Sequence, residues 1–202
     1  KPLSILSYGT YFSIATSLNF FITGKIKHNN KSYKIKPHEW GLIVLFYNFI
    51  KSADTSYNKN KIAELLKYRI EDNHDMVDKM VSELDEENQL FVNKILKGEM
   101  DESMKSIIDD MLLKNDELLQ YLSPNNWASD IKSKTFIMHG ANDSMVPFTE
   151  STLLAKEIPN SEILISFLYE HKEISTNRGI FFKISELFKM VKFFAHYFRY
   201  NK

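Results

Sequence analysis

The hydrophobic pattern of the 202-residue chain changes its period twice. At the beginning, apolar side chains at positions 3, 5 and 6 are followed by Gly9, which predicts a short strand over Pro2 to Tyr8. From about Thr10 to Ser129 the pattern is mainly helical. Within this stretch a polar segment, Lys25 to Ile35, fits either a hairpin or a loop.

Four segments of this stretch predict helices. In one of them, Ile62, Leu65 and Leu66 fall on the same helical face, whereas the segment around Leu42 is apolar on all sides, as expected for a buried helix. Ser123-Pro124 is a stop signal after the last of the four. The predicted helices cover Glu39 to Lys51, Lys59 to Tyr68, Asp75 to Leu84 and Asp101 to Leu122.

The last third of the chain has a different rhythm. Lys134 to His139 is a short apolar run that ends at Gly140, which is typical of a buried strand. It is followed by a predicted helix, a second apolar run and a final helix, over Phe148 to Ile158, Ser161 to Tyr169 and Ile184 to Tyr200. Strand, helix, strand and helix at these lengths predict an α/β fold with a parallel sheet.

Composition narrows the function classes. The 26 basic and 26 acidic residues balance, so the chain lacks the basic surplus that general binding to nucleic acid requires. No cysteine is present, which excludes disulfides and a cysteine nucleophile but does not define the compartment. No segment resembles a signal peptide, and the longest apolar stretch, Leu42 to Ile50, is too short to span a bilayer. We therefore expect no membrane span and favour a cytoplasmic location.

Two charged or polar side chains follow the two predicted strands of the last third. Asp143 comes three residues after the Gly140 that ends the first strand, and His171 follows the second apolar run. Parallel strands joined by one crossover helix bring their carboxyl ends to the same edge of a sheet, where reactive groups gather. A carboxylate beside an imidazole at that edge fixes the ring's tautomer and stabilises the imidazolium.

These residues resemble a known family. A strand ending in His139-Gly140, then Asp143, Val146-Pro147, a helix, a strand and His171 closely resemble the α/β-hydrolase family of serine hydrolases, of the esterase and lipase type. The resemblance implies that Asp143 is the acid of a catalytic triad and His171 its general base. It also implies hydrolysis of a carboxylic ester or related acyl group of a small-molecule substrate. No cofactor is implied, because serine hydrolysis needs none.

The same resemblance divides the chain into three parts. Residues 1–9 would form a sheet strand of the hydrolase core, residues 10–129 a helical cap or lid over the substrate pocket, and residues 130–202 the C-terminal core with acid and histidine. His139 is interpreted as structural, with its neighbour Gly140 allowing the turn. The other histidines show no metal-ligand spacing, and we expect no metal site.

The chain departs from the family at the nucleophile. The family's serine lies in a Gly-x-Ser-x-Gly turn between a strand and a helix, and no two of the six glycines here are four residues apart. The nearest approach is Ser7, two residues before Gly9, but the bulky Ile5 does not suit this crowded turn. We expect the serine to lie upstream of Lys1, so that the chain is an inactive fragment. Ser7 as nucleophile stays the less favoured alternative.

Two hypotheses from other classes stay open. The chain could be a non-catalytic remnant of a hydrolase or an interaction module that lacks a nucleophile, or an unrelated α/β binding protein. In the fragment and remnant interpretations the sheet has an unpaired edge, and an unpaired edge favours a partner strand. The missing N-terminal part of the sheet and a second copy of the chain are the two candidate partners.

Overall fold

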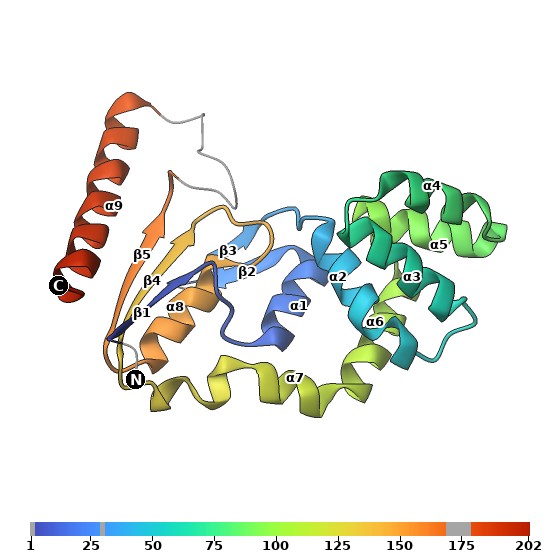
Figure 1. The fold of residues 1–202 in the computed structure, drawn as a ribbon, viewed down its shortest axis with the longest axis horizontal. Coiled ribbons are helices and arrows are strands. Elements are labelled where there is room, and N and C mark those ends of the chain that lie inside the picture. The colour runs from blue at the N-terminus through green and yellow to red at the C-terminus, as the bar shows by residue number, and fades with distance from the viewer. Residues whose placement is uncertain (1–2, 29–30, 169–178) are drawn as a thin grey trace. The chain divides into compact units, whose positions relative to one another are not determined.

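A computed structural model describes residues 3–28, 31–168 and 179–202 of the chain. Figure 1 labels its strands and helices. The strands are β1 Ser4–Tyr8, β2 Lys25–His28, β3 Lys31–Lys34, β4 Lys134–Gly140 and β5 Ser161–Ser166. The α-helices are α1 Ile14–Thr23, α2 Trp40–Phe49, α3 Lys59–Ile70, α4 His74–Ser82, α5 Glu86–Lys97, α6 Glu102–Lys114, α7 Asp116–Leu122, α8 Phe148–Glu157 and α9 Ile180–Tyr200.

The chain forms two compact units. The sheet unit is drawn from Lys1–Phe20, Gly24–Lys36 and Gln120–Lys202, and the helical unit from Phe21–Thr23 and Pro37–Leu119. Of the stretch from Thr10 to Ser129, residues 10–20, 24–36 and 120–129 lie in the sheet unit. The reason is tertiary: Ala128 is buried against residues of β4 and α8, and the Asn125 amide donates to the Phe12 carbonyl.

The sheet unit is built on three parallel strands in the order β1-β4-β5. Ser7 of β1 lies opposite Ile137 of the central strand β4, and Ile137 lies opposite Ile163 of β5. This arrangement confirms the predicted α/β class and the parallel pairing of the strands. Residues of β4 from Thr135 onward are all buried, which explains the uninterrupted apolar run in the sequence.

Helices cover both faces of this sheet. Ile137 packs with Leu154 of α8 on one face. Phe136 and Met138 pack with Phe193 of α9 on the other, because successive side chains of a strand point to opposite faces. Figure 1 shows α8 and α9 on the two sides of the strands. The polar segment predicted as a hairpin or a loop is an antiparallel hairpin of β2 and β3.

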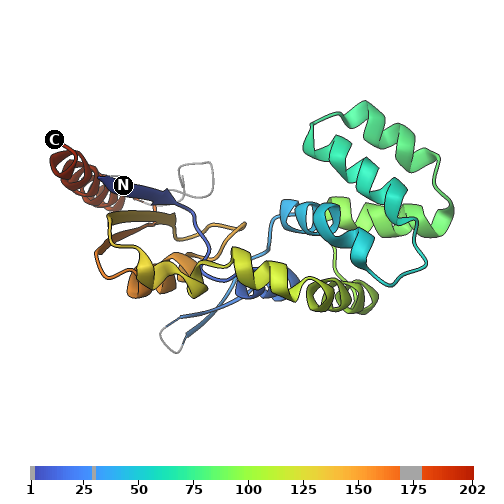
Figure 2. The same cartoon turned by 60° about the horizontal axis from the view of Figure 1, so that its bottom comes forward.

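Four helices of the helical unit have side-chain N-caps. The helices α3, α4, α5 and α6 are each preceded by an Asn or Asp whose side chain accepts a backbone N–H of the first turn: Asn58, Asn73, Asp85 and Asp101. Such caps satisfy amides that have no partner within the helix. The helix α3 packs against α2 and α4, and α4 lies beside α5 (Figure 1, Figure 2).

The predicted helix over Asp101 to Leu122 is two helices. The first, α6, ends at Lys114 and the second, α7, begins at Asp116. The side-chain amide of Asn115 donates to the Met111 carbonyl and to the Ser52 hydroxyl. Asn side chains compete with the helix in this way for backbone partners. The helical spacing of apolar residues does not reveal this break, because the spacing continues from α6 into α7.

Gly41, in α2, is packed closely against the ring of Phe21. A Cβ at this position would press into the ring of Phe21, including the ring carbon nearest the backbone. Overpacking of this kind costs about 1–3 kcal/mol, against roughly 0.5–1 kcal/mol gained by replacing Gly with Ala in a helix. We expect Gly41→Ala to lower the free energy of unfolding by about 1 kcal/mol, measured by urea denaturation followed by circular dichroism.

Gly179→Ala is the control for an added methyl group without overpacking, because a Cβ at Gly179, the N-cap of α9, meets nothing within 4 Å and costs only the weaker capping by Ala. Its unfolding free energy should stay within about 0.5 kcal/mol of the wild-type value. An unchanged or higher stability of Gly41→Ala would contradict the packing described.

The acidic helix caps make the stability of the helical unit depend on pH. Hydrogen bonds, from the Lys94 side chain above all, lower the pKa of the Asp101 carboxyl, and the Asn88 amide lowers the pKa of Asp85. A lowered pKa in the folded state stabilises the fold above the unfolded-state pKa, and this contribution is lost as pH falls through the folded-state value. We expect the urea midpoint to fall between about pH 7 and about pH 3.

Asp101→Asn removes one such titrating group and should show a smaller fall over the same range. Equal falls in the variant and in the wild-type chain would show that Asp101 does not contribute to the pH dependence.

Candidate active site

The loop between β4 and α8, residues 141–147, begins at the carboxyl edge of the sheet. The Ala141 amide donates to the carbonyl of Ser166, the last residue of β5, at 2.8 Å. This bond joins the start of the loop to the end of the neighbouring strand. The loop that carries Asp143 therefore begins where β4 and β5 both end.

Asp143 is nearly completely buried in this loop, with 2% of its surface exposed. Its Oδ1 accepts the backbone amides of Met145 at 2.7 Å and Val146 at 2.9 Å. Its Oδ2 lies 3.6 Å from Nε2 of His139, and a Cβ at Gly9 would lie 3.8 Å from Oδ2. The backbone amides of the turn that follows Asp143 thus hold its carboxylate through Oδ1.

His139, the next-to-last residue of β4, is completely buried. Its Nδ1 lies 2.6 Å from the hydroxyl of Ser151 in α8, and its Nε2 lies 2.9 Å from the Val146 carbonyl oxygen. Both ring nitrogens therefore have polar partners, as the structural interpretation of this histidine requires.

Glu150 of α8 holds the loop that follows β1. The Glu150 carboxylate accepts the amides of Phe12 and Ser13 and the hydroxyl of Thr16, at the start of α1. A buried carboxylate suits this position, because the first amides of a helix lack partners and carry partial positive charge. The sequence pattern does not predict this contact, because its partners are more than 130 residues apart in the chain.

Ser7 does not lie in a turn between a strand and a helix. It is inside β1, and its hydroxyl donates to Thr10 Oγ1 at 3.1 Å. The next helix begins only at Ile14. The nucleophile turn of serine hydrolases places its serine where a strand passes directly into a helix.

His171 lies outside the described residues. The chain just before that segment is anchored, because the Phe167 amide donates to the buried Glu186 carboxylate of α9 at 2.9 Å. The same carboxylate receives the Lys189 side chain at 2.6 Å. The exit from β5 is therefore fixed against α9.

Residues 3–28, 31–168 and 179–202 contain neither a metal-ligand cluster nor a membrane-spanning helix. No group of three or more His, Cys, Asp or Glu side chains there is arranged to hold a metal ion. None of the helices in that part of the chain combines the length and apolar character needed to cross a membrane.

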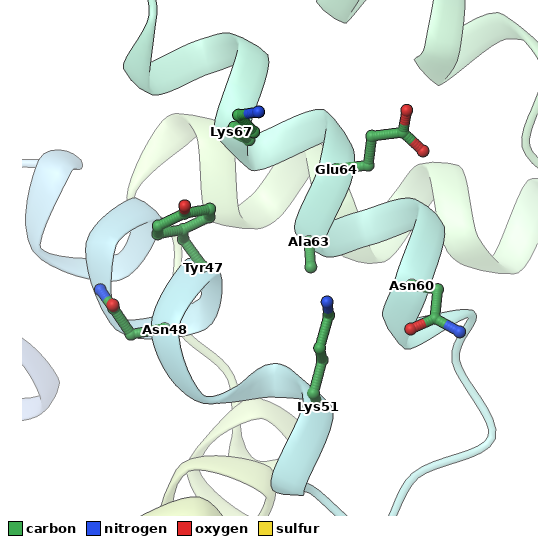
Figure 3. A pocket seen from close by; sticks show the side chains of 7 residues that line it. All are labelled: Tyr47, Asn48, Lys51, Asn60, Ala63, Glu64 and Lys67. Atoms are coloured by element: carbon green, nitrogen blue, oxygen red, sulfur yellow. The ribbon is translucent and has the colours of Figure 1, made fainter.

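The helical unit carries an open recess of about 590 Å³ between α2 and α3 (Figure 3). Six of its seven lining side chains are polar or charged, so it suits a polar group better than an acyl chain. Phe46, Met104 and Met111 of the same unit are buried in its core and do not line the recess. The lining residues are Tyr47, Asn48, Lys51, Asn60, Ala63, Glu64 and Lys67.

The three-stranded parallel sheet, with helices on both faces and a buried Asp in the loop after its central strand, is part of an α/β-hydrolase fold with a helical insertion. A family model described as BD-FAE matches residues 53–158, a little over half of the chain. The chain belongs to this family, which is an esterase- and lipase-like family of the α/β-hydrolase superfamily. The match includes Asp143 and ends before His171.

Membership of the family indicates hydrolase-type activity. No curated protein and no solved structure matches the chain.

Proposed function

We propose that this chain supplies two of the three catalytic side chains of a serine hydrolase that cleaves carboxylic esters or related acyl groups. In this proposal Asp143 is the acid and His171 is the general base. The observation that carries it is the placement of Asp143: a buried carboxylate in the loop after the central parallel strand, beside the end of the neighbouring strand β5.

The sheet topology supports a pairing of the two residues. Ala141 is bonded to Ser166, Asp143 follows Ala141 by two residues, and His171 follows Ser166 by five. A chain extends by at most about 3.3–3.6 Å per residue, so both side chains are within reach of one another from these anchors. Oδ1 of Asp143 accepts two amides, and we assign Oδ2 as the acceptor for the His171 Nδ1–H.

The chemistry then follows from the roles of the pair. His171 Nε2 takes the proton of a serine hydroxyl while the serine oxygen attacks the carbonyl carbon of the substrate. Asp143 stabilises the imidazolium, which gives the proton to the leaving alcohol. Water, deprotonated by the same imidazole, then releases the acid from the acyl-enzyme.

The serine and its oxyanion-binding amides belong, in this proposal, to a polypeptide segment outside these 202 residues. The basis is the absence of a Gly-x-Ser-x-Gly sequence and the position of Ser7 inside a strand. That segment, or a second copy of the chain, would pair with an edge strand of the three-stranded sheet. The helical unit would serve as the cap over the substrate, since it lies between β1 and β4 in the sequence and forms a compact unit of its own.

The absence of that serine motif from the sequence also favours a second candidate function, a hydrolase-fold interaction module without catalysis. The catalytic function requires that Asp143 and His171 interact, whereas an interaction module does not.

The pairing can be tested in the chain as it stands, without the serine. A nearby carboxylate favours a charged imidazole, so we expect the pKa of His171 to lie above the usual value for histidine. In Asp143→Asn the midpoint of the His171 titration, followed by NMR of the ring protons, should move down by about one pH unit. Asp130→Asn, an acidic-to-amide change away from the loop, should leave it in place. Equal midpoints in wild type and Asp143→Asn would contradict the pairing.

The source of the nucleophile is tested with a fluorophosphonate probe, which modifies activated serines. We expect the 202-residue chain to stay unlabelled, because it contains no serine in the required turn. Mass spectrometry that finds stoichiometric modification of Ser7, lost in Ser7→Ala, would overturn the assignment of the serine to another segment.

A further inference from the structure

The proposed function uses Asp143 and His171 and gives no role to His139, although this ring lies against the Asp143 carboxylate. His139 and Ser151 are both completely buried, and Nδ1 of the ring is 2.6 Å from the serine hydroxyl. Buried polar groups are costly unless they are paired. A histidine and a serine placed together in the core behind a candidate catalytic acid therefore call for an explanation.

The partners of the ring determine its tautomer. A carbonyl oxygen can only accept, so the 2.9 Å contact between Nε2 and the Val146 carbonyl requires a hydrogen on Nε2. In the neutral ring Nδ1 is then an acceptor. The Ser151 hydroxyl lies 2.6 Å from Nδ1 and also contacts the Thr10 carbonyl at 3.1 Å, and it is the donor that Nδ1 of a neutral ring needs.

The hydroxyls behind the ring can then be aligned in one direction. Ser7 donates to Thr10 Oγ1 at 3.1 Å, and Thr10 Oγ1 lies 3.3 Å from Ser151 Oγ. With Ser151 donating to His139 and His139 donating to the Val146 carbonyl, each group accepts from one neighbour and donates to the next. This chain of hydrogen bonds joins β1, α8 and β4 to the loop that carries Asp143.

Val146 couples the ring to the carboxylate. Its N–H donates to Oδ1 of Asp143 at 2.9 Å, and its carbonyl accepts from His139. Asp143 therefore binds the N–H of Val146, and His139 binds its carbonyl. A displacement of the Val146 carbonyl also displaces the amide that orients the carboxylate.

We propose that His139 is a positioning residue for Asp143, held in a single tautomer by Ser151 and holding the loop of residues 141–147 through the Val146 carbonyl. The inference deepens the proposed function and rests on it for the catalytic role of Asp143. His139 itself touches no substrate in this proposal.

The test uses the isotope-labelled chain and the variants Ser151→Ala and His139→Gln. Ser151→Ala removes one hydroxyl and leaves Nδ1 of the ring without its donor. We expect hydrogen exchange of the Met145 and Val146 amides to accelerate about tenfold, the effect of losing one buried hydrogen bond. The ¹⁵N shifts of the wild-type His139 ring should report a hydrogen on Nε2 and none on Nδ1.

Thr152→Ala is the matched control, since the Thr152 hydroxyl lies in the same helix and donates to the Phe148 carbonyl instead. Exchange of the Met145 and Val146 amides should be unchanged in it. Where His139→Gln destabilises the whole sheet unit, Ser151→Ala still decides the question, because it adds no bulk and removes a single group.

A positioning role also predicts that the His171 titration midpoint moves in Ser151→Ala toward its value in Asp143→Asn. Faster exchange without this movement would make His139 merely structural and overturn the proposal, as would unchanged exchange or a hydrogen on Nδ1. A midpoint that Asp143→Asn does not move contradicts the proposed function instead, so the two failures are distinguishable.

Discussion

The parallel pairing of β4 with a strand on each side is the interaction on which the rest of the sheet unit depends. Because β1 and β5 occupy its edges and α8 and α9 its faces, β4 is buried along nearly its whole length. The alternation of a strand then determines which side chains meet which helix. His139 lies on the same face as Ile137, which packs on α8, and this is why its ring meets Ser151.

The same pairing explains how the fold accommodates a separate helical unit. β1 and β4 are neighbours in the sheet, yet the whole of the helical unit lies between them in the sequence. The entropy of closing a loop grows only slowly with its length, so a long insertion between paired strands is tolerated when it forms a core of its own. The helical unit has such a core, with Ile43, Phe46 and Leu66 among its completely buried side chains.

Local pattern was enough to predict the three parallel strands and most helices, though not α1 or α5, because the signals of these elements are short-range. The apolar run that ends at Gly140 predicts β4, and the spacing of Ile62, Leu65 and Leu66 predicts α3. The break at Asn115 and the residues around Asp143 were not predictable in this way. Ser151 and Thr10 are 141 residues apart in the sequence, and only the parallel pairing of β1 with β4 brings their elements together.

The central claim is that Asp143 and His171 form one hydrogen-bonded pair. A crystal structure of the chain tests it through a single distance, from Oδ2 of Asp143 to Nδ1 of His171. The proposed function predicts a separation of about 2.7–3.2 Å, the range of an N–H···O hydrogen bond. Side chains that are ordered, turned away from one another and separated by more than about 4 Å would contradict it.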